Sequence, residues 1–324
     1  MPRLRQARTE SPGITRSRTG TGFTYRDTRG VTIRAGEERD RIRALAIPPA
    51  WTDVWIAPAP NDHIQAVGTD AAGRRQYIYH VAWRERMDAQ KFDRMLGLAR
   101  VLPAARRTVT RDLGGEGFGK TRALAGAFRL LDAGSVRPGA DTYTDQHGSY
   151  GITTLLGSHA TVHAGGHVEL RFPGKSGKRW NLLLSDQALA DLVAGLKRRG
   201  PRARLIAWQD DVGGWHPLRP EDINMYVRDR THGEFTAKDF RTLAGTGAAA
   251  LSLARSGNVE GEAAQRRAIA AAMRDAAEAL GNTPAIAKAS YVDPRVVDRF
   301  IAGVTVDPSG RRAIESEVLA LLDS

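Results

Sequence analysis

The sequence contains no cysteine among its 324 residues. This absence excludes disulfide bonds, thiolate nucleophiles and cysteine-ligated zinc. Long apolar runs are also missing: no stretch approaches the length of a bilayer span, and no apolar segment of a signal peptide follows the N-terminus. We therefore expect a cytoplasmic protein that does not bind a membrane.

Patterns that bind metals are scarce. The sequence shows no cluster of carboxylates of the kind that holds two catalytic metal ions. His159, His163 and His167 have the spacing of metal ligands on a helix, but Ala164-Gly165-Gly166 would break a helix at that point. We therefore expect neither a metal nor another cofactor.

Positive charge, by contrast, is in excess. Lys and Arg number 48 against 36 Asp and Glu, which gives a net charge of +12 and a pI near 10.4. Such a surplus favours a polyanion as partner, and without a membrane span nucleic acid is the better candidate. Residues 1–20 place five arginines among Ser, Thr, Gly and Pro, which predicts a disordered basic arm.

Two domains are expected after this arm. Residues 21–90 predict a small β-rich domain, with a hairpin near 23–33, a short helix over 37–45 and three further strands. Residues 91–324 predict a larger, mostly helical domain that carries a β-hairpin with Lys175 at its tip. The expected fold class is α+β.

The last strand of the small domain, over residues 73–79, offers a face suited to DNA. Alternation puts Gln76 on one face and Arg75, Tyr77 and Tyr79 on the other. Cationic and aromatic side chains could lie in a groove, where Gln76 or a nearby arginine such as Arg74 would read base edges. The same alternation fits a sheet face packed on the domain's own helix, and the sequence leaves both interpretations open.

Residues 280–294 read LGNTPAIAKASYVDP and contain two helix starts. Gly281 ends one helix, Thr283-Pro284 begins the next, and Asp293-Pro294 repeats the start signal. Tyr291 therefore lies at a break between helices, where its hydroxyl can reach a ligand. A core tyrosine with a satisfied hydroxyl is the alternative.

Three cations upstream favour the first interpretation. Arg137 follows a helix, Lys175 lies on the hairpin turn, and Arg241 lies in the segment KDFRT. Singly, each is typical of a solvated or ion-paired side chain. Together they suit the cleavage of a phosphodiester without a metal, because guanidiniums stabilise charge on its oxygens and a lysine can protonate the leaving alkoxide. A phenol becomes a usable nucleophile in so positive a site.

The order and context of these motifs resemble the type IB DNA topoisomerases, and the compact poxvirus and bacterial group fits best. The resemblance runs from about Phe23 to the C-terminus. The motifs that carry it are Ile47-Pro48-Pro49-Ala50-Trp51, Gly73-Arg74-Arg75-Gln76-Tyr77-Ile78-Tyr79, Arg137-Pro138-Gly139 with Tyr143, Phe172-Pro173-Gly174-Lys175, Lys238-Asp239-Phe240-Arg241-Thr242, and Gly281-Asn282-Thr283-Pro284 with Ser290-Tyr291.

The resemblance implies a clamp that closes around duplex DNA and relaxes supercoils through a 3′-phosphotyrosyl intermediate, without ATP or a required metal. It implies that Tyr291 attacks, that Arg137 and Arg241 stabilise the transition state, and that Lys175 is the general acid. It is also consistent with a nucleoid-associated monomer that needs no protein partner.

Asn282 departs from the poxviral and eukaryotic pattern, which has histidine nine residues before the tyrosine. An amide can still donate a hydrogen bond to a phosphate oxygen, but it cannot carry a titrating proton. We count Asn282 among the expected catalytic residues, and Tyr143 and Lys288 among the expected DNA contacts.

Two alternatives remain open at this point. A tyrosine recombinase shares the Arg–Lys–Arg–Tyr plan, but recombinases usually have histidine where this chain has Lys238, and they usually lack such an N-terminal domain. The composition alone also permits a basic DNA-binding protein with no catalytic activity.

Overall fold

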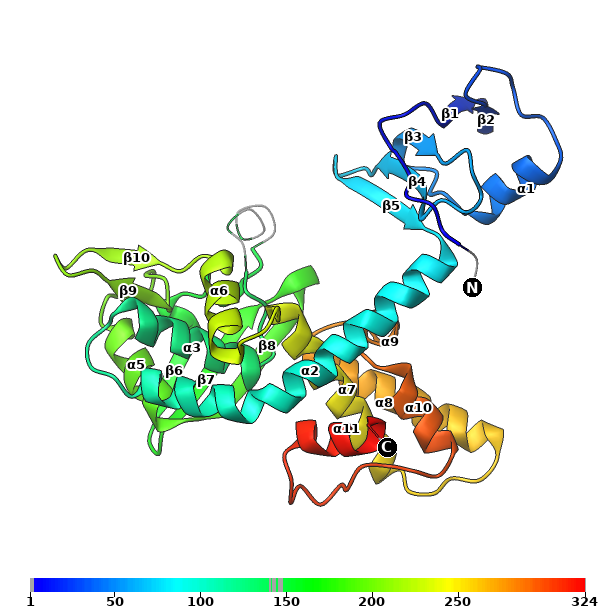
Figure 1. Ribbon diagram of the computed structural model, residues 1–324. Coiled ribbons are helices and arrows are strands. Elements are labelled where there is room, and N and C mark those ends of the chain that lie inside the picture. The colour runs from blue at the N-terminus through cyan, green and yellow to red at the C-terminus, as the bar shows by residue number, and fades with distance from the viewer. Residues whose placement is uncertain (1–2, 140, 142–143, 145–147, 324) are drawn as a thin grey trace. The chain divides into compact units, whose positions relative to one another are not determined.

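The computed structural model describes residues 3–139, 141, 144 and 148–323. The chain divides into two compact units, Met1–Lys91 and Phe92–Ser324. Each unit has its own hydrophobic core. Figure 1 shows a first unit rich in strands and a second unit rich in helices, as the α+β prediction required.

The first unit is built on an antiparallel sheet with the strand order β2-β1-β3-β4-β5. Its elements are β1 (Ile14–Thr19), β2 (Gly22–Arg26), α1 (Glu37–Ala44), β3 (Thr52–Ile56), β4 (Ile64–Thr69) and β5 (Arg75–Tyr79). A small core forms where Ile42 of α1 packs against Val54 and Ile56 of the sheet. The predicted hairpin near 23–33 is confirmed in part: an antiparallel bridge joins Arg26 to Thr32, and the Ile33 amide donates to the Tyr25 carbonyl, at 2.9 Å. The longer ladder of β2 is with β1, a pairing that was not predicted.

The disordered arm predicted over residues 1–20 is wrong. Arg5 forms a bridge with Asp62, and β1 joins the sheet. Ile14 is only 3% exposed and pairs with β3, so one apolar residue fixes the strand on the core. The Arg16 guanidinium donates hydrogen bonds to the carbonyls of Ile47, at 3.2 Å, and Trp51, at 2.6 Å. Arg16 therefore binds backbone carbonyls of its own unit. A count of charges in the sequence cannot distinguish such an arginine from one that is solvated.

The second unit contains most of the helices. Helix α2 (Val81–Leu113) begins in the first unit and continues into the second. The helices that follow are α3 (Lys120–Asp132), α5 (Gln187–Lys197), α6 (Pro220–Thr231), α7 (Ala237–Arg255), α8 (Glu262–Leu280), α9 (Pro284–Ser290), α10 (Pro294–Ile301) and α11 (Ile314–Leu322). None of the described helices has both the length and the hydropathy that a membrane span requires.

The strands of the second unit form two small antiparallel sheets. One has the order β6-β7-β8, and the other pairs β9 with β10. The strands are β6 (Ala160–His163), β7 (His167–Pro173), β8 (Arg179–Ser185), β9 (Ala207–Gln209) and β10 (Trp215–Pro217), with short 3₁₀ turns η1 (Gly157–His159) and η2 (Lys175–Gly177). Strands β7 and β8 are the predicted hairpin, and η2 is its tip.

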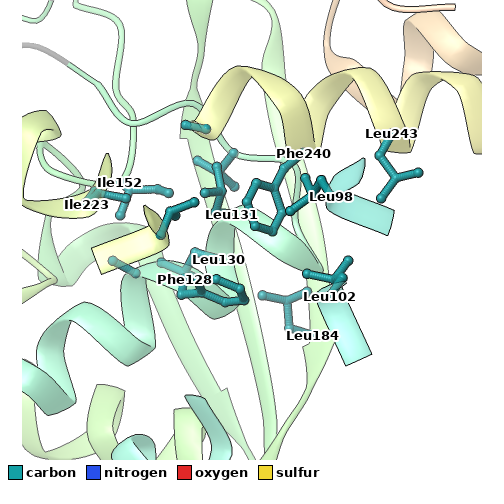
Figure 2. Packing of buried hydrophobic residues seen from close by; sticks show 14 of the residues in the cluster. Leu98, Leu102, Phe128, Leu130, Leu131, Ile152, Leu184, Ile223, Phe240 and Leu243 are labelled. Atoms are coloured by element: carbon teal, nitrogen blue, oxygen red, sulfur yellow. The ribbon is translucent and has the colours of Figure 1, made fainter. Parts of the chain in front are cut away.

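The core of the second unit fixes the start of α7. Figure 2 shows Phe240 of α7 among Phe128 and Leu131 of α3, with Leu98 of α2 close by. The Phe240 and Phe128 rings meet edge to face, with centroids 5.2 Å apart. Because Arg241 is the next residue, this packing holds its backbone in place.

The burial of Ile14 generates a test of the corrected N-terminal segment. Ile14→Ala should destabilise the first unit by about 2–5 kcal/mol, the usual cost of truncating a buried isoleucine. Hydrogen exchange of the β3 and β4 amides measures this loss. The control is Val31→Ala, since Val31 is 59% exposed and should change little. Equally small effects of the two variants would contradict the docking of β1.

Candidate active site

Tyr291 lies at the junction between α9 and α10, and the capping residues predicted from the sequence form that junction. The Thr283 side chain accepts a hydrogen bond from the Ile286 amide at the start of α9, and Asp293 caps α10. Helix α8 ends at Gly281, whose φ of 60° is left-handed and therefore suits glycine. Successive short helices thus place Tyr291 on a sharp turn of the backbone.

Helix α7 anchors the backbone of Tyr291. The Thr246 hydroxyl donates to the Tyr291 carbonyl, at 3.2 Å, and accepts from the Asp293 amide, at 3.1 Å. Gly245 makes this approach available, because a Cβ at that position would lie 2.9 Å from the Tyr291 carbonyl oxygen. The phenol is therefore carried by a backbone that is fixed on both sides of Tyr291.

Arg241 lies beside the phenol and is almost completely buried, at 2% exposure. Its guanidinium donates hydrogen bonds to the carbonyls of Ser135 and Leu280, the latter at 2.7 Å. Its central carbon lies 5.2 Å from the centroid of the Tyr291 ring. Two carbonyls from distant segments thus hold a fixed positive charge against the phenol.

Arg137 and Asn282 form a second contact in the site. An Nη of Arg137 donates to the Asn282 side-chain oxygen at 2.6 Å, which leaves the amide nitrogen of Asn282 facing elsewhere. That nitrogen is buried and has no hydrogen-bond partner among the described residues. A buried donor left without an acceptor costs about 1–3 kcal/mol, so a ligand oxygen that accepts from it would be favoured.

A cavity of about 570 Å³ brings these groups together. It is lined by Arg137, Pro138, Gly139, Ser149, Tyr150, Lys175, Pro220, Asn224, Thr236, Ala237, Lys238, Arg241 and Tyr291. Lys175 reaches it from the hairpin tip η2. Four of the five expected catalytic residues therefore line one cavity, and the fifth, Asn282, contacts Arg137.

The positive charge in this cavity lowers the pKa of Tyr291. Burial alone would raise it, because burial favours the neutral phenol, but the charge and hydrogen bond of Arg241 outweigh that effect. Arg137 and then Lys238 add to the lowering. Burial, with a further contribution from Arg137, lowers the pKa of Arg241 to about 10, so this guanidinium still carries its charge at neutral pH.

Lys238 lines the cavity as well, although the sequence marks it only as the position where recombinases usually have histidine, and not as a site residue. It lies three residues before Arg241, which is one helical turn, so the two side chains share a face of α7. That spacing is the signal that would have identified it. Asn224 and Thr236 line the cavity as well, and nothing in their sequence context distinguishes them.

The expected DNA contacts of the first unit lie on β5. Tyr77 and Tyr79 are 42% and 38% exposed, and their rings stack with centroids 6.0 Å apart. The alternative that this face of β5 packs on the unit's own helix is therefore wrong for Tyr77 and Tyr79, because both rings are exposed. Arg74 and Gln76 both bind the carboxylate of Asp70, at 2.8 and 2.9 Å.

The two remaining candidates lie in the second unit. Lys288 is exposed on α9, and it does not line the cavity. Tyr143 lies outside the described residues.

The three histidines with metal-ligand spacing have other roles in the structure. His159 accepts from the Leu156 amide at 3.1 Å, and His163 and His167 contact the side chains of Glu169 and Ser185. In the part of the chain that the structure describes, no group of three or more His, Asp or Glu side chains could hold a metal ion.

Comparisons with known proteins match both units. Residues 80–302 match the family model for the catalytic core of eukaryotic DNA topoisomerase I, and residues 22–70 match that for the N-terminal domain of bacterial DNA topoisomerase IB. DNA topoisomerase 1B of Acanthamoeba polyphaga mimivirus is 32% identical over 289 residues, which cover 86% of this chain and 85% of that protein. DNA topoisomerase 1 of Mycosarcoma maydis is 24% identical over 248 residues, but these cover only 24% of that longer protein.

The lowered pKa of Tyr291 can be measured directly. Subtracting the ultraviolet titration of Tyr291→Phe from that of the unaltered protein isolates this phenol, and its midpoint should lie below about 10, the value of a free tyrosine. Lys238→Gln removes one of the positive charges and should raise the midpoint. Lys120→Gln, on α3 and paired with Asp222, is the control and should not change it. A midpoint at or above the free value would contradict the electrostatic account.

Proposed function

This chain belongs to the family of type IB DNA topoisomerases, and we propose that Tyr291 is the nucleophile with which it breaks one strand of duplex DNA. The observation that carries the proposal is the contact between the buried Arg241 guanidinium and the Tyr291 ring, in a cavity shared with Arg137 and Lys175. Fixed cations stabilise the phenolate of Tyr291, and they also stabilise the negative charge on the phosphate oxygens in the transition state of cleavage.

In the proposed cleavage step, the Tyr291 oxygen forms a bond to the phosphorus and loses its proton to solvent. The bond from phosphorus to the 5′ oxygen breaks, and Lys175 gives that oxygen a proton. The products are a 3′-phosphotyrosyl diester and a free 5′ hydroxyl. Because one diester replaces another, the reverse step reseals the strand, and no ATP is consumed.

Arg137 and Arg241 are proposed to hold the non-bridging oxygens of the phosphate. Guanidiniums suit this role because they present several donors in a plane and stay protonated. The buried amide of Asn282 is proposed to donate one more hydrogen bond to the phosphate, and Arg137 fixes its orientation. This donor acts without titrating, which distinguishes it from a histidine.

Contacts to DNA away from the reacting phosphate are proposed for two surfaces. The stacked Tyr77 and Tyr79 rings on β5 form an exposed aromatic face. Asp70 binds the side chains of Arg74 and Gln76, and Gln76 lies on the other face of this strand. Lys288, on the exposed side of α9, is proposed to contact a phosphate. Affinity should then fall with rising salt, because such contacts release counterions.

We also propose that a single chain suffices, acting as a nucleoid-associated monomer without a protein partner. Every proposed catalytic side chain comes from the same unit of one chain, so no second copy is needed to complete the site. The recombinase alternative is not favoured, because residues 22–70 match the N-terminal domain of a bacterial topoisomerase IB.

The first experiment is plasmid relaxation without magnesium or ATP. The unaltered protein should relax supercoiled plasmid, and Tyr291→Phe should bind DNA with nearly unchanged affinity but fail to relax it. Tyr25→Phe is the matched control, since it alters a phenol that lies against Arg39 in the first unit, and it should retain activity. Full relaxation by Tyr291→Phe would remove Tyr291 as the nucleophile.

The general-acid role of Lys175 has a separate test. Lys175→Ala should slow cleavage of ordinary DNA by about 10²–10⁴-fold, the usual contribution of general acid catalysis. It should slow cleavage much less when sulfur replaces the 5′ oxygen, because a thiolate leaves without being protonated. An equal defect on the two substrates would count against this role.

A further inference from the structure

Trp180 on β8 is a large side chain that the proposed chemistry does not use. It lies directly opposite Phe172 of β7, and the two rings are stacked, with centroids 5.8 Å apart and planes at 4°. Phe172 is buried in the core of the second unit, and Trp180 packs against that core. The indole therefore has a fixed position at the base of the hairpin that carries Lys175.

One edge of the indole lies on the residue before Lys175. A Cβ built on Gly174 would come within 2.5 Å of the indole Cδ1 and Nε1 atoms, so glycine is required for this close contact. The Gly174 amide also donates to the Lys178 carbonyl at 2.7 Å, which closes the hairpin tip around Lys175. Trp180 thus supports the backbone from which Lys175 projects.

The same nitrogen-bearing edge of the indole also lies on the residue before Asn282, and Nε1 is close to both glycines. A Cβ on Gly281 would come within 2.8 Å of Cζ2 and 3.0 Å of Cε2. Gly281 ends α8 in the left-handed conformation, and the turn that it begins leads through α9 to Tyr291. One rigid ring therefore contacts both the hairpin of Lys175 and the turn of Asn282.

Two residues further along the same strand, Leu182 makes a related contact. A Cβ on Gly134 would come within 2.7 Å of the Leu182 side chain, and Gly134 precedes Ser135, whose carbonyl accepts from Arg241. Since alternate residues of a strand share a face, Trp180 and Leu182 lie on the same face of β8. This face therefore contacts backbone next to three separate parts of the site.

We infer that Trp180 is a positioning residue for strand cleavage, which holds the Lys175 hairpin at a fixed distance from the turn that carries Asn282. The inference rests on the proposed role of Lys175 as general acid. Proton transfer requires the donor within hydrogen-bond reach of the leaving oxygen. A misplacement of about 1 Å can reduce a rate by about 10²-fold.

The test combines Trp180→Ala with Lys175→Ala and measures single-turnover cleavage of DNA. Trp180→Ala should slow cleavage by about 10–100-fold at nearly unchanged DNA affinity, and sulfur in place of the 5′ oxygen should restore most of the rate. The double variant should be no slower than Lys175→Ala alone, because a residue that acts only through Lys175 has nothing left to position.

A second variant separates the stacking on Phe172 from the contacts of the indole with Gly174 and Gly281. Trp180→Phe keeps an aromatic ring to stack on Phe172 but lacks the indole nitrogen and the outer ring atoms that lie on Gly174 and Gly281, so its defect should be intermediate. This smaller change also serves if Trp180→Ala fails to fold. Trp215→Ala is the control, since Trp215 lies on β10, where its ring contacts Phe118 and Arg199. The cleavage rate of this variant should match that of the unaltered protein.

Additive defects of Trp180→Ala and Lys175→Ala would overturn the inference, as would an equal defect of Trp180→Ala on the oxygen and sulfur substrates. The proposed function is judged separately on Lys175→Ala. If that variant alone shows no rescue by sulfur, the general-acid role fails. If it is rescued and Trp180→Ala is not, only the role of Trp180 fails.

Discussion

The structure depends on one constraint: a phenol must be surrounded by cations that cannot move away from it. Arg241 meets this constraint because it is buried and because the carbonyls of Ser135 and Leu280 orient its guanidinium. Burial opposes ionisation of Tyr291, yet the nearby charge outweighs burial and the pKa falls. An exposed arginine would be screened by solvent and would not produce this effect.

The rest of the second unit serves to bring distant segments to that contact. Phe240 fixes the start of α7 on the core, so that Arg241 projects from a rigid turn. Thr246 and Gly245 then bring the backbone of Tyr291 against the same helix. Catalytic groups that act together must be held in place before the substrate arrives, because ordering them during the reaction would raise the barrier.

Much of this arrangement could be predicted from the sequence where the signal is local. The capping roles of Thr283 and Asp293 depend on residues within one turn, and both are present in the structure. The alternation along β5 likewise predicted the face shared by Tyr77 and Tyr79. The five residues expected to act on the phosphate could be named because their motifs resemble a family. Their residue types alone would not distinguish them from ordinary surface or core side chains.

The features that the sequence did not reveal are long-range. Strand β1 pairs with β3 across some forty residues of chain, and its arginine bonds to carbonyls that no local pattern identifies. The contact between Arg137 and Asn282, the closeness of Gly245 to Tyr291 and the two contacts of Trp180 each join segments far apart in sequence. Such contacts follow from tertiary packing, and the hydrophobic periodicity of the sequence does not predict them.

The most direct test of the central claim is the chemistry of the trapped intermediate. Cleavage reactions stopped with denaturant should contain a DNA strand attached through its 3′ phosphate to the protein. Proteolysis and mass spectrometry of that adduct should place the nucleotide on the peptide that contains Tyr291. Attachment to another residue, or through a 5′ phosphate, would contradict the account.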